Sequence, residues 1–170
     1  ENVVRQWLEK GIIKQVTYSR WNSPLCVSFK KNVATGLKDS DPSNVRVNFD
    51  GRQINKKLQK YNYELAIISE IFEKIGGSEI YSTIDLKDAF HTFKIRESDQ
   101  HITAFTWNGR QYAWVGAPFG LHILSFQFQR VMNIILGAFT NFSSVFIDDI
   151  CVFSANTEEH AIHLEQVIQT

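Results

Sequence analysis

Three aspartates stand out in this sequence because each carboxylate interrupts an apolar run. Asp148 and Asp149 are adjacent between two short apolar segments, and Asp85 has an apolar residue on either side. Neighbouring ionised carboxylates repel each other, and burial disfavours the charged form of each, so such a pair needs a compensating partner. Carboxylate oxygens suit Mg²⁺, and two such ions roughly 3.5 to 4 Å apart serve phosphoryl transfer. The pattern therefore favours a metal-dependent site for phosphoryl transfer.

The apolar runs around the aspartates predict the strands that position them. Residues 145–147 and 150–153 have the pattern of two strands joined at the carboxylate pair, and residues 80–86 predict a further strand. Successive side chains of a strand project to opposite faces, so the adjacent pair is expected to reach both sides of the hairpin. If these strands are neighbours in one sheet, we expect the carboxyls of Asp85 and Asp148 to lie within about 8 Å, close enough to share a divalent ion.

Two other interpretations of the carboxylates stay open. An Asp-Asp pair can form a turn without any metal, since aspartate is common in turns. A metal-dependent nuclease or phosphatase would also gather carboxylates in this way. The five histidines are scattered along the sequence and predict no competing site for a softer metal.

The other elements alternate between helical and strand periodicity. The expected helices comprise residues 3–10, ending at Gly11, residues 65–75, ending at Gly76-Gly77, residues 124–139, and a helix capped by Asn156 that extends to residue 168. The expected strands comprise residues 25–29 and 45–49, joined by a polar loop at 31–44, and a hairpin at 103–115 that turns at Asn108-Gly109. This mixture without repeats predicts an α+β fold.

Composition and charge limit the class of protein. With 44% hydrophobic residues, no run long enough to span a bilayer and a charged start, the chain is expected to be globular and soluble, without a signal peptide. Cys26 and Cys151 lie within apolar runs, so we expect buried, reduced thiols and a reducing intracellular compartment. Residues 1–60 hold 12 Lys and Arg against 5 Asp and Glu, and residues 61–170 hold 6 against 13. This asymmetry fits a phosphate-binding lobe beside a cation-binding lobe, and equally two solvated faces.

The segments around the aspartates resemble a known family. Phe146-Ile-Asp-Asp149, followed by Ile150-Cys-Val-Phe-Ser154, is similar to the Tyr/Phe-x-Asp-Asp signature of reverse transcriptases of the gypsy-type LTR retrotransposon and retroviral pol family. The resemblance covers about residues 3 to 168, and seven further segments stand in family order: Asn22-Ser-Pro24 with Lys30-Lys31, Arg46 to Asn55, Ile84 to Phe90, Thr103-Ala-Phe105, Ala117 to Leu121, Phe128-Gln-Arg130 and Glu158-Glu-His160. Phe119 stands where retroviruses usually carry Gln, which favours the retrotransposon or plant pararetrovirus branch.

This resemblance implies a right-hand polymerase palm with a partial fingers subdomain. Residues 1–62 are expected mainly in the fingers and residues 63–170 mainly in the palm, which carries the catalytic sheet. No thumb or RNase H sequence is present, so we expect a fragment of a longer pol polyprotein. The implied activity is RNA-directed DNA polymerisation, in which dNTPs are added to a primer 3′-OH.

The resemblance also implies partners and a location. The expected partners are an RNA or DNA template, a DNA or tRNA primer, dNTPs and the missing parts of the polyprotein, with no membrane. The expected location is intracellular, in cytoplasmic virus-like particles, in the nucleus or in both.

Individual roles follow from the same resemblance. Asp85, Asp148 and Asp149 match the catalytic aspartates that hold two Mg²⁺ ions, for which Mn²⁺ can substitute, and the backbone carbonyl of Leu86 would complete the shell of one ion. Phe90 matches the aromatic gate that excludes a ribose 2′-OH, although an ordinary core position would also suit this ring. The other nucleotide-binding positions are matched by Lys30, Lys31, Arg46, Asp88, Ala89, Phe119 and Gly120.

Three segments depart from the family pattern. His122 to Ser125 stands where the family usually has Asn-Ala-Pro, Tyr63 to Ala66 replaces Tyr-Pro-Leu-Pro, and Gly51 replaces an aromatic residue. The loss of prolines and rigid turns relaxes the loops that carried them. A decayed or domesticated relic that only binds nucleic acid, through the basic first third of the chain, therefore stays open beside an active polymerase.

Overall fold

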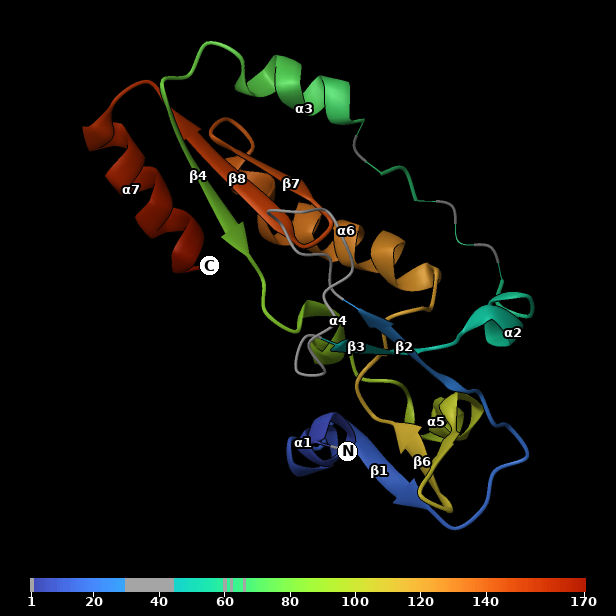
Figure 1. Cartoon of the computed structure of the whole chain (residues 1–170). Helices are drawn as coiled ribbons and strands as arrows, with labels where there is room; N and C mark the ends of the chain where they lie inside the picture. The colour runs from blue at the N-terminus through green and yellow to red at the C-terminus, as the bar shows by residue number, and fades with distance from the viewer. Residues whose placement is uncertain (1, 30–44, 60, 62, 66) are drawn as a thin grey trace. The chain divides into compact units, whose positions relative to one another are not determined.

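The structure is a computed structural model of the whole chain and describes every residue except 1, 30–44, 60, 62 and 66. The chain forms two compact units (Figure 1). The first comprises Glu1–Gln59 and Phe90–His122, and the second comprises Lys60–Ala89 and Ile123–Thr170. The expected polar loop at 31–44 lies outside the described residues. These units are defined by contacts between residues, and contacts alone do not assign fingers and palm. The expected boundary between fingers and palm at residue 62 therefore stays a prediction.

Among its described residues, the first unit contains two antiparallel sheets. The larger sheet has the strand order β1-β6-β5, and the smaller one pairs β2 with β3. The described helices and strands of this unit are α1 (Asn2–Glu9), β1 (Ile13–Val16), β2 (Leu25–Phe29), β3 (Val45–Phe49), α2 (Arg52–Asn55), α4 (Ala89–Thr92, which begins at the unit boundary), α5 (Glu97–Gln100), the 3₁₀ helix His101–Thr103, β5 (Phe105–Trp107) and β6 (Arg110–Trp114).

Two predicted turns of the first unit have the backbone that their residues favour. Gly11, with a φ of +65°, ends α1 in the left-handed region. Asn108 and Gly109 have φ angles of +47° and +72°, the sign that a two-residue hairpin turn requires at both positions. The predicted hairpin is confirmed, but its first strand begins only at Phe105. Thr103 instead closes the 3₁₀ helix, where its hydroxyl donates to the Gln100 carbonyl oxygen at 2.7 Å.

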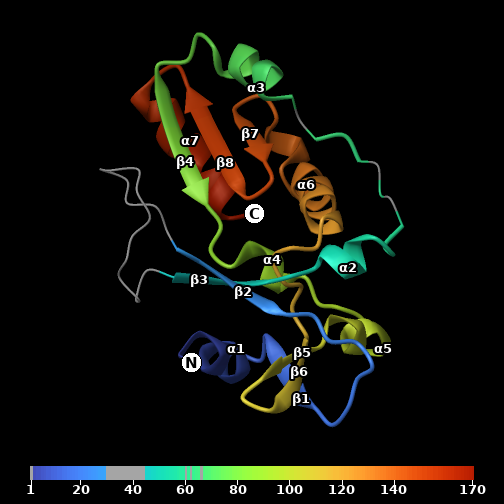
Figure 2. The ribbon, with the colours of Figure 1, turned by 45° about the vertical axis from the view of Figure 1, so that its right-hand side comes forward.

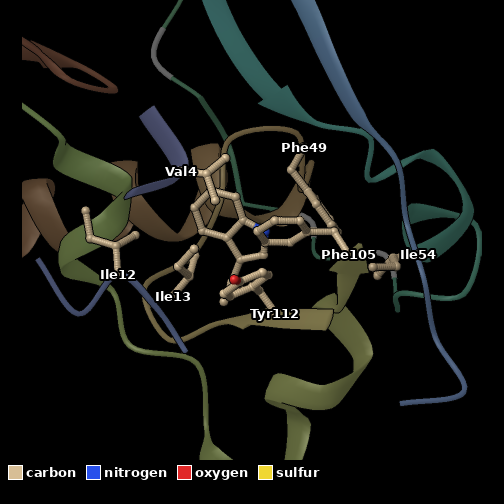
Figure 3. Packing of buried hydrophobic residues seen from close by; sticks show 8 residues of the cluster. Val4, Ile12, Ile13, Phe49, Ile54, Phe105 and Tyr112 are labelled. Atoms are coloured by element: carbon tan, nitrogen blue, oxygen red, sulfur yellow. The ribbon is translucent and has the colours of Figure 1, made fainter. Parts of the chain in front are cut away.

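A cluster of aliphatic and aromatic side chains fills the first unit (Figure 3). Trp114 is only 1% exposed, and its indole lies 5.8 Å from the fully buried ring of Phe105. The cluster consists of Val4, Ile12, Ile13, Phe49, Ile54, Phe105, Tyr112 and Trp114. Truncating one aromatic residue in such a core costs about 3–5 kcal/mol. This cluster therefore holds α1, β3 and the larger sheet together.

The second unit is built on one three-stranded antiparallel sheet. Its strand order is β4-β8-β7, and Figure 2 shows the three strands side by side. Helix α7 packs against β8 and β4, and α6 packs against β7. The helices and strands of this unit are α3 (Ile68–Ile75), β4 (Ile80–Asp85), α6 (Ile123–Ile135), the 3₁₀ helix Gly137–Phe139, β7 (Ser143–Phe146), β8 (Asp149–Ser154) and α7 (Thr157–Ile168).

The helices of the second unit differ from expectation mainly at their ends. α3 begins at Ile68 rather than at residue 65, because Ile67 is still extended, with a ψ of 124°. α6 ends at Ile135, and Gly137, a poor helix former, starts a separate 3₁₀ helix where one helix was expected to continue. The predicted cap of α7 is confirmed, since the Asn156 side chain accepts from the Glu159 amide at 2.9 Å.

The expected mixture of helices and antiparallel sheets is confirmed, but the expected burial of the thiols is wrong for Cys26. Cys26 is exposed because β2 and β3 form a sheet of only two strands. Cys151 is partly buried, and burial raises the pKa of its thiol. In the described part of the chain, no helix has the length and apolar character needed to cross a membrane.

Candidate active site

The pairing of β4 with β8 brings Asp85 beside the Asp-Asp pair. Asp85 is the last residue of β4 and lies opposite Asp149, the first residue of β8. Directly opposed residues of antiparallel strands project from the same face, with Cβ atoms about 4.5–5.5 Å apart. Both side chains are exposed. The expectation that the two strands are neighbours is confirmed, and the direct partner of Asp85 is Asp149. The distance between the carboxyls of Asp85 and Asp148 stays a prediction.

The hairpin turn lies one residue earlier than the carboxylate pair indicated. β7 ends at Phe146, which pairs with Asp149, so the turn consists of Ile147 and Asp148. The two aspartates therefore do not form the turn together, because the register assigns Asp149 to the strand. The Leu86 amide donates to the Asp148 carbonyl oxygen at 3.4 Å. This contact keeps the turn beside the end of β4.

Gln129 of α6 supports this turn, a role that sequence analysis missed. Ile147 has a φ of +57°, which β-branched residues rarely adopt and which costs about 1–3 kcal/mol. The fully buried Gln129 accepts from the Ile147 amide at 2.7 Å through Oε1 and donates to the Val145 carbonyl oxygen at 3.0 Å through Nε2. The signal in the sequence was a glutamine beside the apolar positions Phe128 and Met132, because a buried amide needs partners.

The opposite face of the sheet anchors the same strands. Ile150 is 5% exposed and Val152 is fully buried, in alternation with the exposed aspartate of β8. On this face, Nε2 of His160 lies 2.7 Å from the Ser82 hydroxyl, and its Nδ1 lies 2.9 Å from the Ser154 hydroxyl. The imidazole of α7 therefore links β4 to β8, which keeps Asp85 and Asp149 in register.

The three aspartates offer the oxygen ligands that a hard divalent cation prefers. Among the described residues, their carboxylates make no hydrogen bond or ion pair. Two like charges opposed on one sheet face destabilise each other, so a cation between Asp85 and Asp149 would relieve the repulsion. Within the described ranges, no three acidic, His or Cys side chains converge as a metal-binding cluster. In the described part of the chain, the structure thus shows two opposed carboxylates on neighbouring strands.

A pocket of about 370 Å³ opens beside Asp149 in the second unit. Thr83 and Cys151, which share the exposed face of the sheet with Asp149, contribute to its lining, and Ile71 of α3 forms another part. α3 itself has no buried residue, so it covers the sheet only loosely. The carboxylate of Asp149 is therefore accessible from a hollow on this face.

Some of the predicted nucleotide-binding residues belong to the first unit. Arg46 is exposed on β3, opposite Ser28. The rings of Phe90 and Phe119 meet edge to face, with centroids 5.0 Å apart, and Phe119 is 42% exposed. Gly120, which follows, has a φ of +109°. The structure therefore brings Phe90 to Phe119, as one small aromatic surface.

The other predicted nucleotide-binding residues lie elsewhere. Asp88, with a φ of +56°, and Ala89, which is 5% exposed, end the first segment of the second unit. Lys30 and Lys31 lie outside the described residues. The choice between the two lysines stays a prediction.

An ion pair stabilises the connection from β3 to α2. The Arg52 guanidinium binds both carboxylate oxygens of Asp50, with the shortest contact at 2.6 Å, and the Arg52 amide donates to the same group at 3.1 Å. These hydrogen bonds lower the pKa of Asp50 from 3.8 to about 2. The Asp50–Arg52 pair therefore shapes the backbone that connects β3, the strand of Arg46, to α2.

Comparison with known sequences finds relatives over nearly the whole chain. The Pol polyprotein of the transposon gypsy from Drosophila melanogaster is 32% identical over 169 residues, which is 99% of this chain and 16% of that polyprotein. The Pol polyprotein of transposon 297 from the same fly is 34% identical over 98% of the chain and 15% of the polyprotein. Polyprotein P3 of Commelina yellow mottle virus is 36% identical over 73% of the chain and 7% of that protein. The chain thus spans only a small part of these relatives.

Solved structures and a family profile agree with these relatives. The crystal structure of the prototype foamy virus protease-reverse transcriptase matches 98% of this chain and 21% of its own, with a TM-score of 0.83 and 26% identity. Its structure with an RNA/DNA hybrid matches 98% of this chain and 21% of its own, with a TM-score of 0.83 and 27% identity. The profile of the family described as reverse transcriptase (RNA-dependent DNA polymerase) matches residues 30–170, which include all three aspartates. On these grounds, the chain belongs to the reverse transcriptase family.

Proposed function

We propose that this chain is the catalytic core of an RNA-directed DNA polymerase within a retroelement Pol polyprotein, and that it adds dNTPs to a primer 3′-OH. The observation that carries the proposal is the pairing of Asp85 with Asp149 on an exposed sheet face, next to the turn that holds Asp148. Membership of the reverse transcriptase family supports the same chemistry. A nuclease or phosphatase would account for the carboxylates but not for Arg46 and Phe90.

Asp85, Asp148 and Asp149 would hold two Mg²⁺ ions, with the Leu86 carbonyl oxygen as a further ligand and Mn²⁺ as a substitute. Such ions stabilise charge on the attacking and leaving oxygens of a phosphoryl group. The residues of the chain contribute geometry: the β4–β8 register sets the spacing of two carboxylates, and Gln129 holds the turn of the third. These roles suit phosphoryl transfer, in which catalysis depends mainly on positioning the reactants and on electrostatic stabilisation.

The nucleotide would be bound by residues outside the aspartate group. Arg46, together with Lys30 or Lys31, would hold the triphosphate, because a guanidinium fork and an ammonium both suit phosphate oxygens. The ring of Phe90 would occupy the space that a ribose 2′-OH needs and would thereby exclude ribonucleotides. The remaining proposed contacts are made by Asp88, Ala89, Phe119 and Gly120.

Template and primer are the proposed partners. The foamy virus protease-reverse transcriptase, at 27–28% identity, has been solved with an RNA/DNA hybrid and with double-stranded DNA. The basic first third of this chain, with 12 Lys and Arg among 60 residues, supports an equivalent role in binding phosphates. We therefore extend the proposal to an RNA or DNA template, a DNA or tRNA primer, and action in virus-like particles, in the nucleus or in both.

Primer extension on an RNA template with Mg²⁺ tests this function in the longer reverse transcriptase that contains this chain. Asp148→Asn should lower kcat at least about a hundredfold, because a lost charge at a metal site removes several kcal/mol of transition-state stabilisation. Asp99→Asn changes a half-exposed carboxylate of α5 and should leave kcat within about twofold.

The wild-type and variant results separate the alternatives. Template-primer binding by the wild type without extension would support a relic that only binds nucleic acid. Cleavage of the template without extension would support a nuclease. An equal fall of kcat in Asp99→Asn and Asp148→Asn would remove the catalytic assignment of the aspartates.

A further inference from the structure

The side-chain amide of Asn55 binds the backbone just after Phe119 at two points. Its Nδ2 donates to the Gly120 carbonyl oxygen at 2.8 Å, and its Oδ1 accepts from the His122 amide at 3.1 Å. A primary amide offers one donor side and one acceptor side, so it can pair with a carbonyl and an amide two residues apart. Two such hydrogen bonds fix both the position and the orientation of the backbone at residues 120–122.

The backbone also holds Asn55 close to this segment. The backbone amide of Asn55 donates to the Gly51 carbonyl oxygen at 2.8 Å. A Cβ atom on Gly51 would lie 2.6 Å from the Gly120 carbonyl oxygen, and a Cβ atom on Gly120 would collide with the Phe49 carbonyl oxygen. The backbones at 49–51 and at 120 therefore touch directly, at a place where neither has room for a side chain. The aromatic residue that the family usually carries at position 51 would not fit this approach.

The ring of Phe119 packs against other aromatic rings. It meets the rings of Phe90 and His91 edge to face, at centroid distances of 5.0 and 5.4 Å. His91 is 7% exposed, stacks on Trp114 at 5.5 Å, and has its Nδ1 2.9 Å from the Ala117 carbonyl oxygen. The segment that carries Phe119 is thus held both by aromatic contacts of the Phe119 ring and by the hydrogen bonds of Asn55 to residues 120 and 122.

We propose that Asn55 is a positioning residue for nucleotide binding, which holds Gly120 and thereby presents the exposed ring of Phe119 in a fixed place. The proposal rests on the proposed function in one respect, namely that Phe119 and Gly120 contact the incoming nucleotide. A binding surface that is ordered beforehand loses less conformational entropy when its ligand binds. Release of the segment therefore weakens nucleotide binding, while the aspartates that support the chemical step belong to other elements.

Steady-state kinetics of the reverse transcriptase that contains this chain test the role. Asn55→Ala removes both hydrogen bonds, and Asn55→Asp keeps an acceptor for the His122 amide but places a carboxylate against the Gly120 carbonyl oxygen. Each variant should raise the KM for dNTP about five- to tenfold, the equivalent of one net hydrogen bond, with kcat within about twofold. Template-primer affinity and the melting temperature should change little.

Asn22→Ala is the matched control. Asn22 is an exposed asparagine of the same unit that accepts one hydrogen bond, from the Thr106 hydroxyl at 2.9 Å, and its loss should leave the KM for dNTP unchanged. An unchanged KM in both Asn55 variants would overturn the proposal. A joint fall of kcat, template-primer affinity and melting temperature would also overturn it, because that pattern indicates a purely structural role.

Amide hydrogen exchange separates this proposal from the proposed function. Release of the Asn55 contacts should speed exchange at the His122 amide in Asn55→Ala but not in Asn22→Ala, whether or not the protein polymerises DNA. If wild-type protein incorporates no dNTP while the exchange difference appears, the proposed function fails and the positioning of residues 120–122 stands. Equal exchange in wild type and Asn55→Ala would reject the positioning itself.

Discussion

At the scale of single residues, the buried amide of Gln129 is placed to control the geometry of the Asp148 turn. It bonds to Val145 and Ile147, and its Nε2 also donates to the Asn133 side chain at 2.9 Å. Gln129→Leu leaves these polar partners without the amide, so we expect a loss of about 1–3 kcal/mol in the free energy of unfolding. Because the strained turn at Ile147 loses its support, kcat for primer extension should fall as well. Urea denaturation and single-turnover kinetics measure the two effects.

Gln129→Glu and Gln166→Leu provide the comparison for this prediction. The glutamate keeps an acceptor for the Ile147 amide but cannot donate when ionised, so its kcat should lie between those of the wild type and Gln129→Leu. Gln166 is exposed on α7, and its replacement should alter neither quantity by a measurable amount. A Gln129→Leu variant that unfolds at lower urea but keeps its full kcat would limit Gln129 to a structural role.

A second prediction at this scale concerns Phe90, which has no charge. If its ring lies beneath the incoming sugar, Phe90→Val opens the space for a 2′-OH and should raise rNTP use relative to dNTP by orders of magnitude. If Phe90 is only a core aromatic that supports Phe119, truncation should cost about 3–5 kcal/mol of stability and depress both activities together. Measurement of kcat/KM for a matched dNTP and rNTP decides between the two.

Phe142→Val is a suitable control for Phe90→Val. Phe142 is likewise partly buried and packs on aromatic neighbours, the rings of His163 at 3.8 Å and of Phe139 at 5.6 Å, but it belongs to the second unit. Its truncation should lower stability without changing the ratio of rNTP to dNTP use. A shift of that ratio in Phe142→Val would show that destabilisation alone alters sugar selection.

At the scale of elements, the Asp50–Arg52 pair couples the end of β3 to the start of α2. Because the folded-state pKa of Asp50 is lowered to about 2 from 3.8, the unfolded chain binds more protons between these values. The stabilisation is therefore fully present above about pH 4 and is lost as the pH falls through about 2. Asp50→Asn should remove this part of the pH dependence.

Tryptophan fluorescence is a suitable probe for this prediction, because Trp7, Trp21, Trp107 and Trp114 all belong to the first unit. Urea midpoints of the wild type and of Asp50→Asn should differ most at pH 5 and converge toward pH 2. Glu9→Gln, which removes an exposed carboxylate of α1 from the same unit, should keep the wild-type pH dependence. Parallel curves for wild type and Asp50→Asn over this range would contradict the role of the pair.

At the scale of the whole molecule, the uneven charge of the sequence predicts how the chain meets nucleic acid. With 12 Lys and Arg in the first 60 residues and 13 Asp and Glu in the remainder, phosphate contacts should come mainly from the first third. The 170-residue chain alone should bind template-primer weakly, and its affinity should fall at least about tenfold between roughly 50 and 200 mM salt. Fluorescence anisotropy of a labelled duplex measures this. Salt-independent binding, or processive extension of long products by this chain alone, would contradict the prediction.

The sequence by itself determined the features that depend on neighbours along the chain. Asn108-Gly109 predicted a hairpin because both residues tolerate positive φ, and Asn156 predicted a helix start because its side chain can accept from the amide three residues later. The aspartates were recognised because charges within apolar strands are costly, whatever the fold around them. The boundaries of α3 and α6 were less accurate, since apolar periodicity continues past the residue at which the backbone leaves the helix.

Only the tertiary structure decided which distant residues meet. The register that opposes Asp85 to Asp149, the Gln129 amide beneath Ile147 and the Asn55 contact with Gly120 all join residues far apart in the sequence. Periodicity shows which side of a strand is apolar, but it carries no information on which residue lies opposite or on which amide finds a partner. The exposure of Cys26 has the same cause, because burial depends on what covers a strand and not on the strand itself.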